Sequence, residues 1–373
     1  MHLIRRAFIV ILLFCTVFLL YEYIYKLQIT ERLENEESVN GSNTKYVLYW
    51  SPFMNNRWDY EWGFGYEAFE DCEYKDCFTT NSRTFMPLEK FDALIFHASY
   101  SVVQSQYGVP HIRSPDQIYV YMNLESPRWT EWKLVSFKSF FNWTMTYRLD
   151  SDIISQYGYL YKKKNNYFSM PSKEQLKNKT GAAWLVSHCD TDTKREILVR
   201  ELQKFYKVDV YGSCGNLTCS RKTSRQCYEM IERKYKFYLS FENSYCKDYV
   251  TEKLFNVLLL NVVPIVYSAG INENVVPPKS IINIADFKNA GHLADYLKYL
   301  DDNVDEYVKY LEWKKDYSIR TERRIAACRL CEKLHQPLKR SVYEDISGWW
   351  FGKNYTMCQT GKKLPKIVSE LLK

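Results

Sequence analysis

The chain has 373 residues and a mass of 44.6 kDa, which at ~150 residues per domain favours two domains. Hydrophobic residues make up 46% and charged residues 25%, a globular composition that excludes wholesale disorder and a collagen-like fold. Lys and Arg exceed Asp and Glu by 51 to 44, a net charge of +7 that is too dilute for a dedicated nucleic-acid binder. A mild basic excess does suit a cleft that receives an anionic substrate.

An apolar segment near the N-terminus predicts a membrane anchor. Residues 7–21 carry no charge, and extension to residue 25 gives 19 residues, close to the ~20 that span a bilayer. Two arginines precede the segment, so the positive-inside rule places residues 1–6 in the cytosol and the rest of the chain in the lumen. No small-residue cleavage site follows, which favours an uncleaved signal anchor at 7–25 over the alternative, a signal peptide that is removed.

Two further features agree with a lumenal body. Five sequons, each permissive for N-glycosylation, follow the expected anchor, at Asn40, Asn142, Asn178, Asn216 and Asn354. The sequence has eleven cysteines, and one of them, Cys15, lies in the anchor, which leaves ten on the oxidising side. An even number of cysteines in that compartment indicates disulfides.

A first domain is expected after a short stem. Residues 26–45 are polar and show no apolar period, which is typical of a flexible lumenal stem. A domain at 46–160 then contains apolar, strand-like runs at 46–50, 91–98 and 117–126. Residues 161–180 are basic and polar and contain proline, so we expect them to connect this domain to a second one.

In the second domain, expected at 181–345, strand-like and helix-like segments alternate. The predicted strands are 182–189, 208–212, 236–243, 262–268 and 280–287, and the predicted helices are 194–206, 225–235 and 249–260. This alternation predicts parallel βαβ units with helices on both faces of a sheet, whose ligands bind at the carboxyl ends of the strands. Residues 346–373 are expected to be a C-terminal extension.

The chemistry is concentrated just after the strand predicted at 236–243. Asp248 is placed to cap a helix that begins at Tyr249, and the free N–H groups of such a helix terminus suit a diphosphate. In the first turn, Lys253 could neutralise phosphate, and Glu252 could accept hydrogen bonds from ribose or sugar hydroxyls. The same two residues also suit an ordinary first turn with a solvated lysine, so residue types alone leave both interpretations open.

The segment FENSYCKDYVTEKLFNVLLLNVVPIVY, residues 241–267, is similar to the donor-binding signature of the α1,3-fucosyltransferases, which use GDP-fucose. Other stretches resemble this family in the same order along the chain: FHASY at 96–100, YVYMNLESPRW at 119–129, FNWTMTYRLDSDI at 141–153, VDVYGSCG at 208–215, VPPKSIINIADF at 276–287 and the Cys-x-x-Cys at 328–331. The resemblance therefore runs from about Tyr46 to Cys331.

The resemblance implies an α/β fold of the GT-B type, with two Rossmann-like domains facing across a cleft. The first domain would bind the acceptor and the second GDP-fucose. It also implies an inverting transfer of L-fucose from GDP-β-L-fucose to the 3-hydroxyl of a GlcNAc in glycoprotein or glycolipid glycans. The expected location is the Golgi membrane, as a single-pass type II protein. No tightly bound cofactor or metal ligand set is expected, and a divalent cation, Mn or Mg, is expected at most to stimulate.

The family's functional residues transfer to matching positions of this sequence. Glu125, in the Asn-Leu-Glu-Ser-Pro block, is implied as the general base that deprotonates the acceptor hydroxyl. The implied donor contacts are Arg195, Asn243, Tyr249, Glu252 and Lys253. This assignment is physically coherent, because a single displacement at a sugar carbon needs one base and a cationic environment for the departing diphosphate. Glu125 ends a strand just before a proline, and burial there would raise its pKa toward neutrality.

Three other motifs are weaker. Asp150-Ser151-Asp152 and Asp190-Thr191-Asp192 have the Asp-x-Asp form with which other glycosyltransferases hold a metal, but we favour structural roles for both. The Gly63-x-Gly65-x-x-Ala68 match does not follow a buried strand, so it is not expected to bind a dinucleotide.

The cysteine spacing gives one hypothesis about the disulfides. Cys328 and Cys331 lie in a helix-like stretch, where they make poor partners for each other, so we expect them to pair with Cys72 and Cys77. A zinc site built on Cys328, Cys331 and His335 is the alternative, but no second pair of ligands has matching spacing.

Two alternative functions are a catalytically inactive family member that binds glycans or nucleotide, and a transferase for a different nucleotide sugar. The acceptor is not specified by the sequence: an antenna GlcNAc and the innermost GlcNAc of an N-glycan both remain open. Acceptor choice is expected to lie in loops around residues 100–116.

Overall fold

The structure is a computed structural model that describes residues 43–53, 60–98, 108–130, 132–165, 167–219, 224–337 and 341–372. Residues 46–373 fall in one compact unit, to which the following description applies. Within the described residues, no helix is both long enough and apolar enough to cross a bilayer. The expected cytosolic tail, the anchor at 7–25, most of the stem, and Asn40 lie outside the described residues, as do residues 100–107 of the expected acceptor loop.

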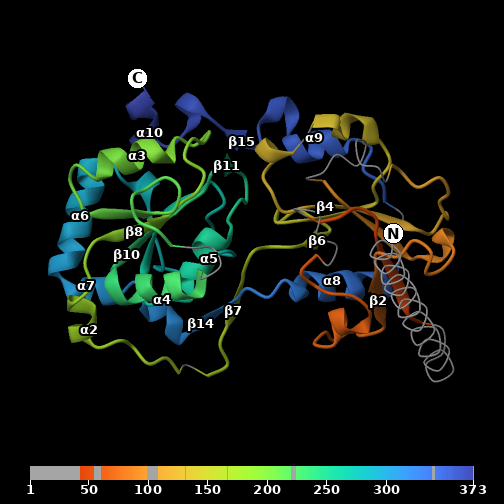
Figure 1. The fold of residues 1–373 in the computed structure, drawn as a ribbon, viewed down its shortest axis with the longest axis horizontal. Coiled ribbons are helices and arrows are strands. Elements are labelled where there is room, and N and C mark those ends of the chain that lie inside the picture. The colour runs from red at the N-terminus through yellow and green to blue at the C-terminus, as the bar shows by residue number, and fades with distance from the viewer. Residues whose placement is uncertain are drawn as a thin grey trace, which may run out of the picture. The chain divides into compact units, whose positions relative to one another are not determined.

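The first half of the unit contains a six-stranded sheet with the order β2-β1-β3-β4-β5-β6 (Figure 1). Its strands are β1 (Lys45–Tyr49), β2 (Cys77–Thr80), β3 (Ala93–His97), β4 (Ile118–Asn123), β5 (Trp143–Thr146) and β6 (Ile153–Ile154). The pairs from β1 through β3, β4 and β5 to β6 are all parallel. Three of these strands, β1, β3 and β4, are the ones predicted; β2, β5 and β6 are short and were not predicted.

The second half contains a five-stranded parallel sheet with the order β13-β12-β10-β8-β9. Its strands are β8 (Ala182–Leu185), β9 (Val208–Tyr211), β10 (Phe237–Phe241), β12 (Val263–Tyr267) and β13 (Ile282–Asn283). Between and after them lie the helices α3 (Arg195–Leu202), α4 (Ser224–Lys234), α5 (Glu252–Leu258), α6 (Ala290–Asp302) and α7 (Val304–Val308). Two parallel sheets with alternating strands and helices confirm the predicted α/β class.

Burial explains why the central strands could be predicted from the sequence. All five residues of β10 and all five of β12 are buried, and both strands are mostly apolar without the alternation of a half-exposed strand. Continuous runs are typical of parallel strands covered on both faces. β13, in contrast, has two residues and leads directly into a 3₁₀ turn at Ile284–Asp286, so the strand predicted at 280–287 is much shorter than expected.

The segment expected to connect the domains is partly structured. Strand β7 (Tyr159–Lys162) pairs antiparallel with β14 (Tyr317–Arg320), and the short helix α2 (Lys173–Lys177) is closed by a capping box on Ser172. The chain thus crosses between the two halves twice, in adjacent strands.

After β14 the chain returns to the first half, which the predicted boundary at 345 does not represent. Helix α8 (Arg324–His335) packs Ala326, Leu330 and Leu334 in the same hydrophobic cluster as Val120 of β4. Disulfides Cys72–Cys328 and Cys77–Cys331 fasten this helix to the first half, as the spacing hypothesis expected. A helix 200 residues downstream of a sheet has no local signal for the sheet that it covers.

The C-terminal segment belongs to both cores. Helix α9 (Ile346–Phe351) packs with the first sheet, and α10 (Lys366–Ser369) packs with the second. Between them, β15 (Cys358–Gln359) pairs with β11 (Tyr245–Cys246), and the disulfide Cys246–Cys358 joins the two strands. Residues 346–373 are therefore an integral part of the fold rather than an appendage.

Candidate active site

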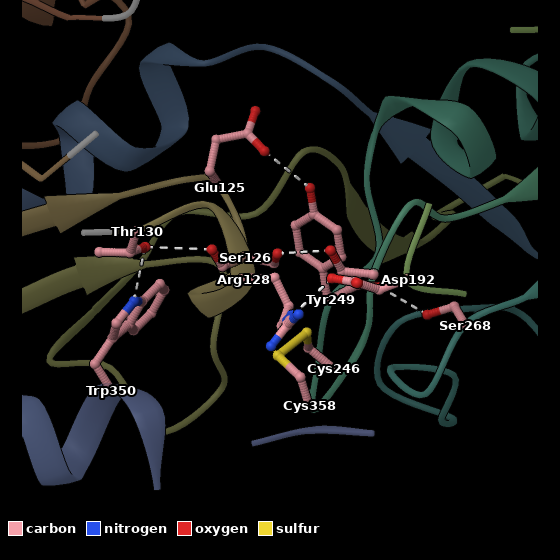
Figure 2. Close-up of a disulfide and its surroundings, with 11 residues drawn as sticks. Glu125, Ser126, Arg128, Thr130, Asp192, Cys246, Tyr249, Ser268, Trp350 and Cys358 are labelled. Atoms are coloured by element: carbon pink, nitrogen blue, oxygen red, sulfur yellow. Dashed lines mark hydrogen bonds and ion pairs between the residues drawn. A yellow bond between two sulfur atoms is a disulfide. The ribbon is translucent and has the colours of Figure 1, made fainter. Parts of the chain in front are cut away.

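The loop after β4 carries the proposed base. The side chain of Asn123, the last residue of β4, accepts a hydrogen bond from the backbone N–H of Glu125 (3.0 Å) and donates one to the Thr130 hydroxyl (2.8 Å). The indole N–H of Trp350 also donates to that hydroxyl (3.0 Å), so helix α9 supports the loop (Figure 2). Pro127 then begins a 3₁₀ turn, which ends at Trp129. The Asn-x-Glu-Ser-Pro pattern thus forms a turn that these hydrogen bonds hold in place and that positions Glu125.

Glu125 is partly buried and meets the second half of the molecule. Its Oε2 accepts a hydrogen bond from the Tyr249 hydroxyl at 3.2 Å (Figure 2). Burial raises the pKa of Glu125 above its usual range, and the Lys253 ammonium and the Tyr249 hydroxyl oppose this shift without cancelling it. A carboxylate with a raised pKa is a stronger base than a solvated one, which is what deprotonation of a sugar hydroxyl requires.

Tyr249 is held by contacts with both halves of the molecule. Its side chain is 2% exposed, and its ring packs edge-to-face on Tyr147 at a centroid distance of 5.0 Å. Its backbone carbonyl accepts a hydrogen bond from the Ser268 hydroxyl (2.6 Å) (Figure 2). Its position relative to Glu125 is therefore determined by packing on both sides.

Helix α5 begins at Glu252, three residues later than predicted. Its N-cap is Thr251, whose hydroxyl accepts from the backbone N–H of Lys253. Asp248, expected to be the cap, adopts a left-handed conformation (φ 58°) and accepts instead from the backbone N–H of Leu149 at 3.2 Å. Asp248 therefore accepts a hydrogen bond from a distant backbone N–H group instead of capping the adjacent helix.

Lys253 lies between two carboxylates. Its Nζ is 3.2 Å from Oε2 of Glu242 and 3.1 Å from Oε1 of Glu252, and its side chain is 24% exposed. Burial by itself would lower the pKa of Lys253, but the two carboxylates raise it overall, so the ammonium stays charged. Burial likewise opposes ionisation of Glu252, yet the ammonium lowers the pKa of that carboxyl.

Glu242 is a site residue that sequence reasoning missed. Its carboxylate is 1% exposed and accepts from the backbone N–H (2.8 Å) and the hydroxyl of Thr251, in addition to the Lys253 ion pair. Burial raises its pKa, and Lys253 opposes that shift. The available signal was an acidic residue directly after the mostly apolar strand β10, because a charge at that place needs a dedicated partner.

Arg195, the first residue of α3, is 3% exposed and faces inward. Its Nη1 donates to the carbonyl of Phe241 (2.6 Å) and its Nη2 to the carbonyl of His188 (3.1 Å). Burial lowers its pKa, and Glu242 opposes that shift. In the described part of the chain, its Nε is buried without a hydrogen-bond partner. The guanidinium thus ties the end of β10 to the loop after β8.

Asn243 follows Glu242 at the end of β10 and is partly buried. Its Oδ1 has no hydrogen-bond partner among the described residues, although it is removed from solvent. Of the six residues implied by the family resemblance, direct contacts therefore join Glu125 to Tyr249 and Glu252 to Lys253. Arg195 is linked to the strand that precedes Asn243 through the Phe241 carbonyl.

Three further contacts join residues 126–129 to the second half. The hydroxyl of Ser126 donates to that of Ser244 (2.8 Å), and Arg128 forms an ion pair with Asp192 (2.6 Å) (Figure 2). The ring of Trp129 lies edge-on to the ring of His188 at a centroid distance of 5.0 Å. The turn that carries Glu125 is thus the meeting point of the two halves.

Both Asp-x-Asp triplets make contacts that explain them structurally. Asp150 pairs with Arg148 (2.6 Å), and Asp152 accepts from the backbone N–H of Thr144 (2.9 Å). Asp190 pairs with Lys194 (2.7 Å), and Asp192 with Arg128.

The zinc alternative fails because the cysteine sulfur atoms that it needs are bonded in disulfides. Cys77, Cys331 and His335 do lie close together, but the two cysteines are bonded to each other, and Cys328 is bonded to Cys72. The remaining cysteines outside the expected anchor also pair, as Cys189–Cys214, Cys219–Cys227 and Cys246–Cys358. A thiolate ligand set is therefore absent from the described residues.

The four described sequon asparagines differ in their environment. Asn178, Asn216 and Asn354 are exposed. Asn142 is half-buried: its Oδ1 accepts from Arg113 and from the backbone N–H of Tyr119 (2.9 Å), and its Nδ2 donates to the carbonyl of Ser341 (3.0 Å).

Two family models match the chain. The model for the N-terminal region of fucosyltransferases matches residues 42–158, and the model for the C-terminal region of glycosyltransferase family 10 (fucosyltransferase) matches residues 174–349.

Individual relatives agree with these models. Alpha-(1,3)-fucosyltransferase C of Drosophila melanogaster is 37% identical over 83% of this chain and 78% of its own length. Glycoprotein 3-alpha-L-fucosyltransferase A of the same organism is 38% identical over 66% of this chain and 50% of its own length. A human 4-galactosyl-N-acetylglucosaminide 3-alpha-L-fucosyltransferase is 38% identical over 61% of this chain and 62% of its own length.

One similar solved structure is an alpha1,3-fucosyltransferase with GDP-fucose, with a TM-score of 0.45 and 19% identity over 73% of this chain and 83% of that one. The two family models together match well over half of the sequence, and the first relative is matched over more than two thirds of its length. The chain therefore belongs to glycosyltransferase family 10 and is a fucosyltransferase.

Proposed function

We propose that this protein is an inverting α1,3-fucosyltransferase that moves L-fucose from GDP-β-L-fucose to the 3-hydroxyl of a GlcNAc in glycoprotein or glycolipid glycans. The observation that carries the proposal is the contact between Glu125 and Tyr249. It brings a carboxylate with a raised pKa, from one half of the molecule, to the segment of the other half that matches the family's donor signature.

In this proposal Glu125 is the general base. It takes the proton from the acceptor hydroxyl, whose oxygen attacks the anomeric carbon of fucose while the bond from that carbon to the diphosphate oxygen breaks. Attack from the side opposite the leaving group converts the β-linkage of the donor into an α-linkage. GDP departs with the electron pair of the broken bond, so the leaving group gains negative charge that a nearby cation stabilises.

Lys253, Tyr249, Glu252, Arg195 and Asn243 are proposed as donor contacts. Lys253 is the cation for the diphosphate, since its ammonium stays charged between Glu242 and Glu252. Glu252 has a side chain that is 47% exposed and offers oxygens to sugar or ribose hydroxyls. For Arg195 and Asn243, the groups proposed to meet the donor are Nε and Oδ1, which are buried and have no hydrogen-bond partner in the described part of the chain. Two Nη donors of Arg195 hold backbone carbonyls, so this residue also positions the loop around it.

The remaining assignments complete the proposal. The protein is proposed to be a single-pass type II protein of the Golgi membrane, anchored by residues 7–25, with the catalytic region in the lumen. Its two domains are proposed to have a GT-B arrangement, one built on the six-stranded sheet with α8 and α9 and the other on the five-stranded sheet. A divalent cation, Mn or Mg, stimulates without a dedicated set of protein ligands. The names of the relatives include both a glycoprotein and a 4-galactosyl-N-acetylglucosaminide acceptor, so both acceptor classes belong in the test.

The alternatives have less support. An inactive member that only binds glycans or nucleotide would have no need of the buried charge set Glu242, Glu252 and Lys253, and the comparisons do not support it. A donor panel of nucleotide sugars tests the other alternative directly.

The decisive experiment incubates the purified full-length chain with labelled GDP-fucose and with an antenna disaccharide, a core N-glycan or buffer alone. Glu125→Gln is expected to lower kcat by about 10²- to 10⁴-fold while GDP-fucose still binds. The matched control is Glu67→Gln, which changes an exposed carboxylate and is expected to leave kcat unchanged. Absence of both transfer and GDP-fucose binding in the unchanged protein would refute the proposal.

A further inference from the structure

Among the tryptophans whose side chains the structure describes, Trp129 is the most exposed. Its relative exposure is 47%, whereas Trp50, Trp62, Trp143, Trp184, Trp313 and Trp350 are at most 7% exposed. An indole ring has a large apolar surface, and leaving it in water forgoes the free energy that burial would provide. Exposed apolar surface of this size is typical of ligand-binding grooves and interaction sites.

The Trp129 ring is also held in place by its surroundings, unlike an exposed side chain that makes no contacts. Pro127 starts the turn that ends at Trp129, and the backbone N–H of Trp129 donates to the carbonyl of Ser126 (2.9 Å). The neighbouring Arg128 is anchored by its ion pair with Asp192. On the other side, the indole ring makes a T-shaped contact with the ring of His188.

His188 is itself fixed by the second half of the molecule. Its carbonyl accepts the hydrogen bond from Nη2 of Arg195, and the next residue, Cys189, is in a disulfide with Cys214. Trp129 therefore stands between two elements of the candidate active site: it is four residues after Glu125 in the same turn, and its ring contacts the loop that Arg195 positions.

We propose that the exposed face of Trp129 stacks on a pyranose ring of the acceptor glycan and so orients the hydroxyl that Glu125 deprotonates. Pyranose rings present an apolar patch of C–H groups, which matches the flat face of an indole, and a pre-positioned ring loses little conformational freedom on binding. This inference rests on the proposed function and names the residue of the acceptor side that recognises the sugar.

The test separates acceptor binding from donor binding and from stability. In Trp129→Ala, the KM for the acceptor is expected to rise about tenfold or more, which corresponds to about 1.4 kcal/mol and lies in the range that truncation of a hot-spot tryptophan costs. The Kd for GDP-fucose and the melting temperature are expected to stay at their original values. Trp129→Phe keeps an aromatic face and is expected to restore most of the affinity for the acceptor. The matched control is Tyr299→Ala, which removes an equally exposed ring (47%) from α6 and is expected to change neither constant.

Three results would overturn the inference: an unchanged acceptor KM in Trp129→Ala, an equal loss in Tyr299→Ala, or a parallel weakening of GDP-fucose binding with a lower melting temperature. The last would make Trp129 a structural residue of the junction. If the unchanged protein transfers no fucose, the proposed function is refuted, and the inference about Trp129 is then tested by glycan binding alone. Saturation-transfer NMR with the antenna disaccharide and the core N-glycan must then show contact in the unchanged protein and in Tyr299→Ala but not in Trp129→Ala. Equal signals, or no contact of either glycan with the unchanged protein, would refute it.

Discussion

The hydroxyl of Tyr249 donates a hydrogen bond to Glu125 across 124 residues of sequence and across the junction of the two sheets. Glu125 follows β4 of the first sheet, and Tyr249 precedes α5 beside the second. The bond favours the ionised form of Glu125, so an element of the donor-side segment adjusts the basicity of the proposed catalytic base.

Substitution of Tyr249 should therefore change the pH dependence of the reaction. The base must be ionised, so kcat/KM falls as the pH drops through the pKa of Glu125, which is already above the usual glutamate range. Tyr249→Phe removes a hydrogen bond to the carboxylate and raises that pKa further, so the acidic limb is expected to move to higher pH. The acidic limb is measured by plotting kcat/KM for the acceptor against pH at a saturating donor concentration.

A suitable control for that profile is Tyr206→Phe, which removes a hydroxyl–carboxylate bond of the same kind, to Asp301 at 2.6 Å. It should leave the limb where it is. A limb that is unmoved or shifted to lower pH in Tyr249→Phe would show that the hydroxyl does not stabilise the Glu125 carboxylate.

The ion cluster around Lys253 should contribute to stability as well as to donor binding. Lys253→Met leaves the buried Glu242 carboxylate without its cation, and breaking a buried pair costs about 3–5 kcal/mol. Lys247→Met breaks only a surface ion pair, in which the side chains of Lys247 and Asp150 are 50% and 43% exposed. This change should alter stability by less than about 0.5 kcal/mol. Denaturant unfolding of both variants measures the difference, and equal midpoints would contradict the assigned burial of the Glu242–Lys253 pair.

The disulfides should differ in their effect on stability. Cys246–Cys358 closes a loop with a sequence separation of 112, whereas Cys219–Cys227 closes one of 8. Loop-closure entropy makes removal of the first about 2 kcal/mol more destabilising than removal of the second. Double alanine variants of each pair, compared by thermal unfolding, test the order, and a larger loss in Cys219→Ala/Cys227→Ala would reverse it.

Sequon use should follow the environment of the asparagine. Asn142 uses its side-chain amide to hold Tyr119 and Ser341, and a glycan on Nδ2 would displace the bond to Ser341, so we expect this sequon to stay unoccupied. Asn142→Gln should therefore leave the glycan mass of the secreted-pathway protein unchanged but lower the stability by about 1–3 kcal/mol. Asn178→Gln, at an exposed site, should remove one glycan with little effect on stability. Intact mass before and after enzymatic deglycosylation distinguishes these outcomes, and a glycan lost in Asn142→Gln would contradict the first.

Local patterns predicted the strands and helices best where burial is uniform. β3, β4, β10 and β12 are buried throughout and mostly apolar, as a parallel strand covered on both faces requires whatever its neighbours are. The prediction for α5 was less accurate, because the capping rule considers only nearby backbone groups. Asp248 had a better partner in Leu149, 99 residues earlier, and the cap passed to Thr251.

The sequence by itself determined the α/β class, the alternation of strands and helices from β8 to β12 and the motif that carries Glu125, since each depends on residues close together in the chain. Tertiary structure alone decided that α8 and α9 return to the first sheet, that Glu242 anchors Lys253, and that Tyr249 reaches Glu125. These contacts arise when two separately patterned halves pack together. Their partners are distant in sequence, so no local period or spacing records them.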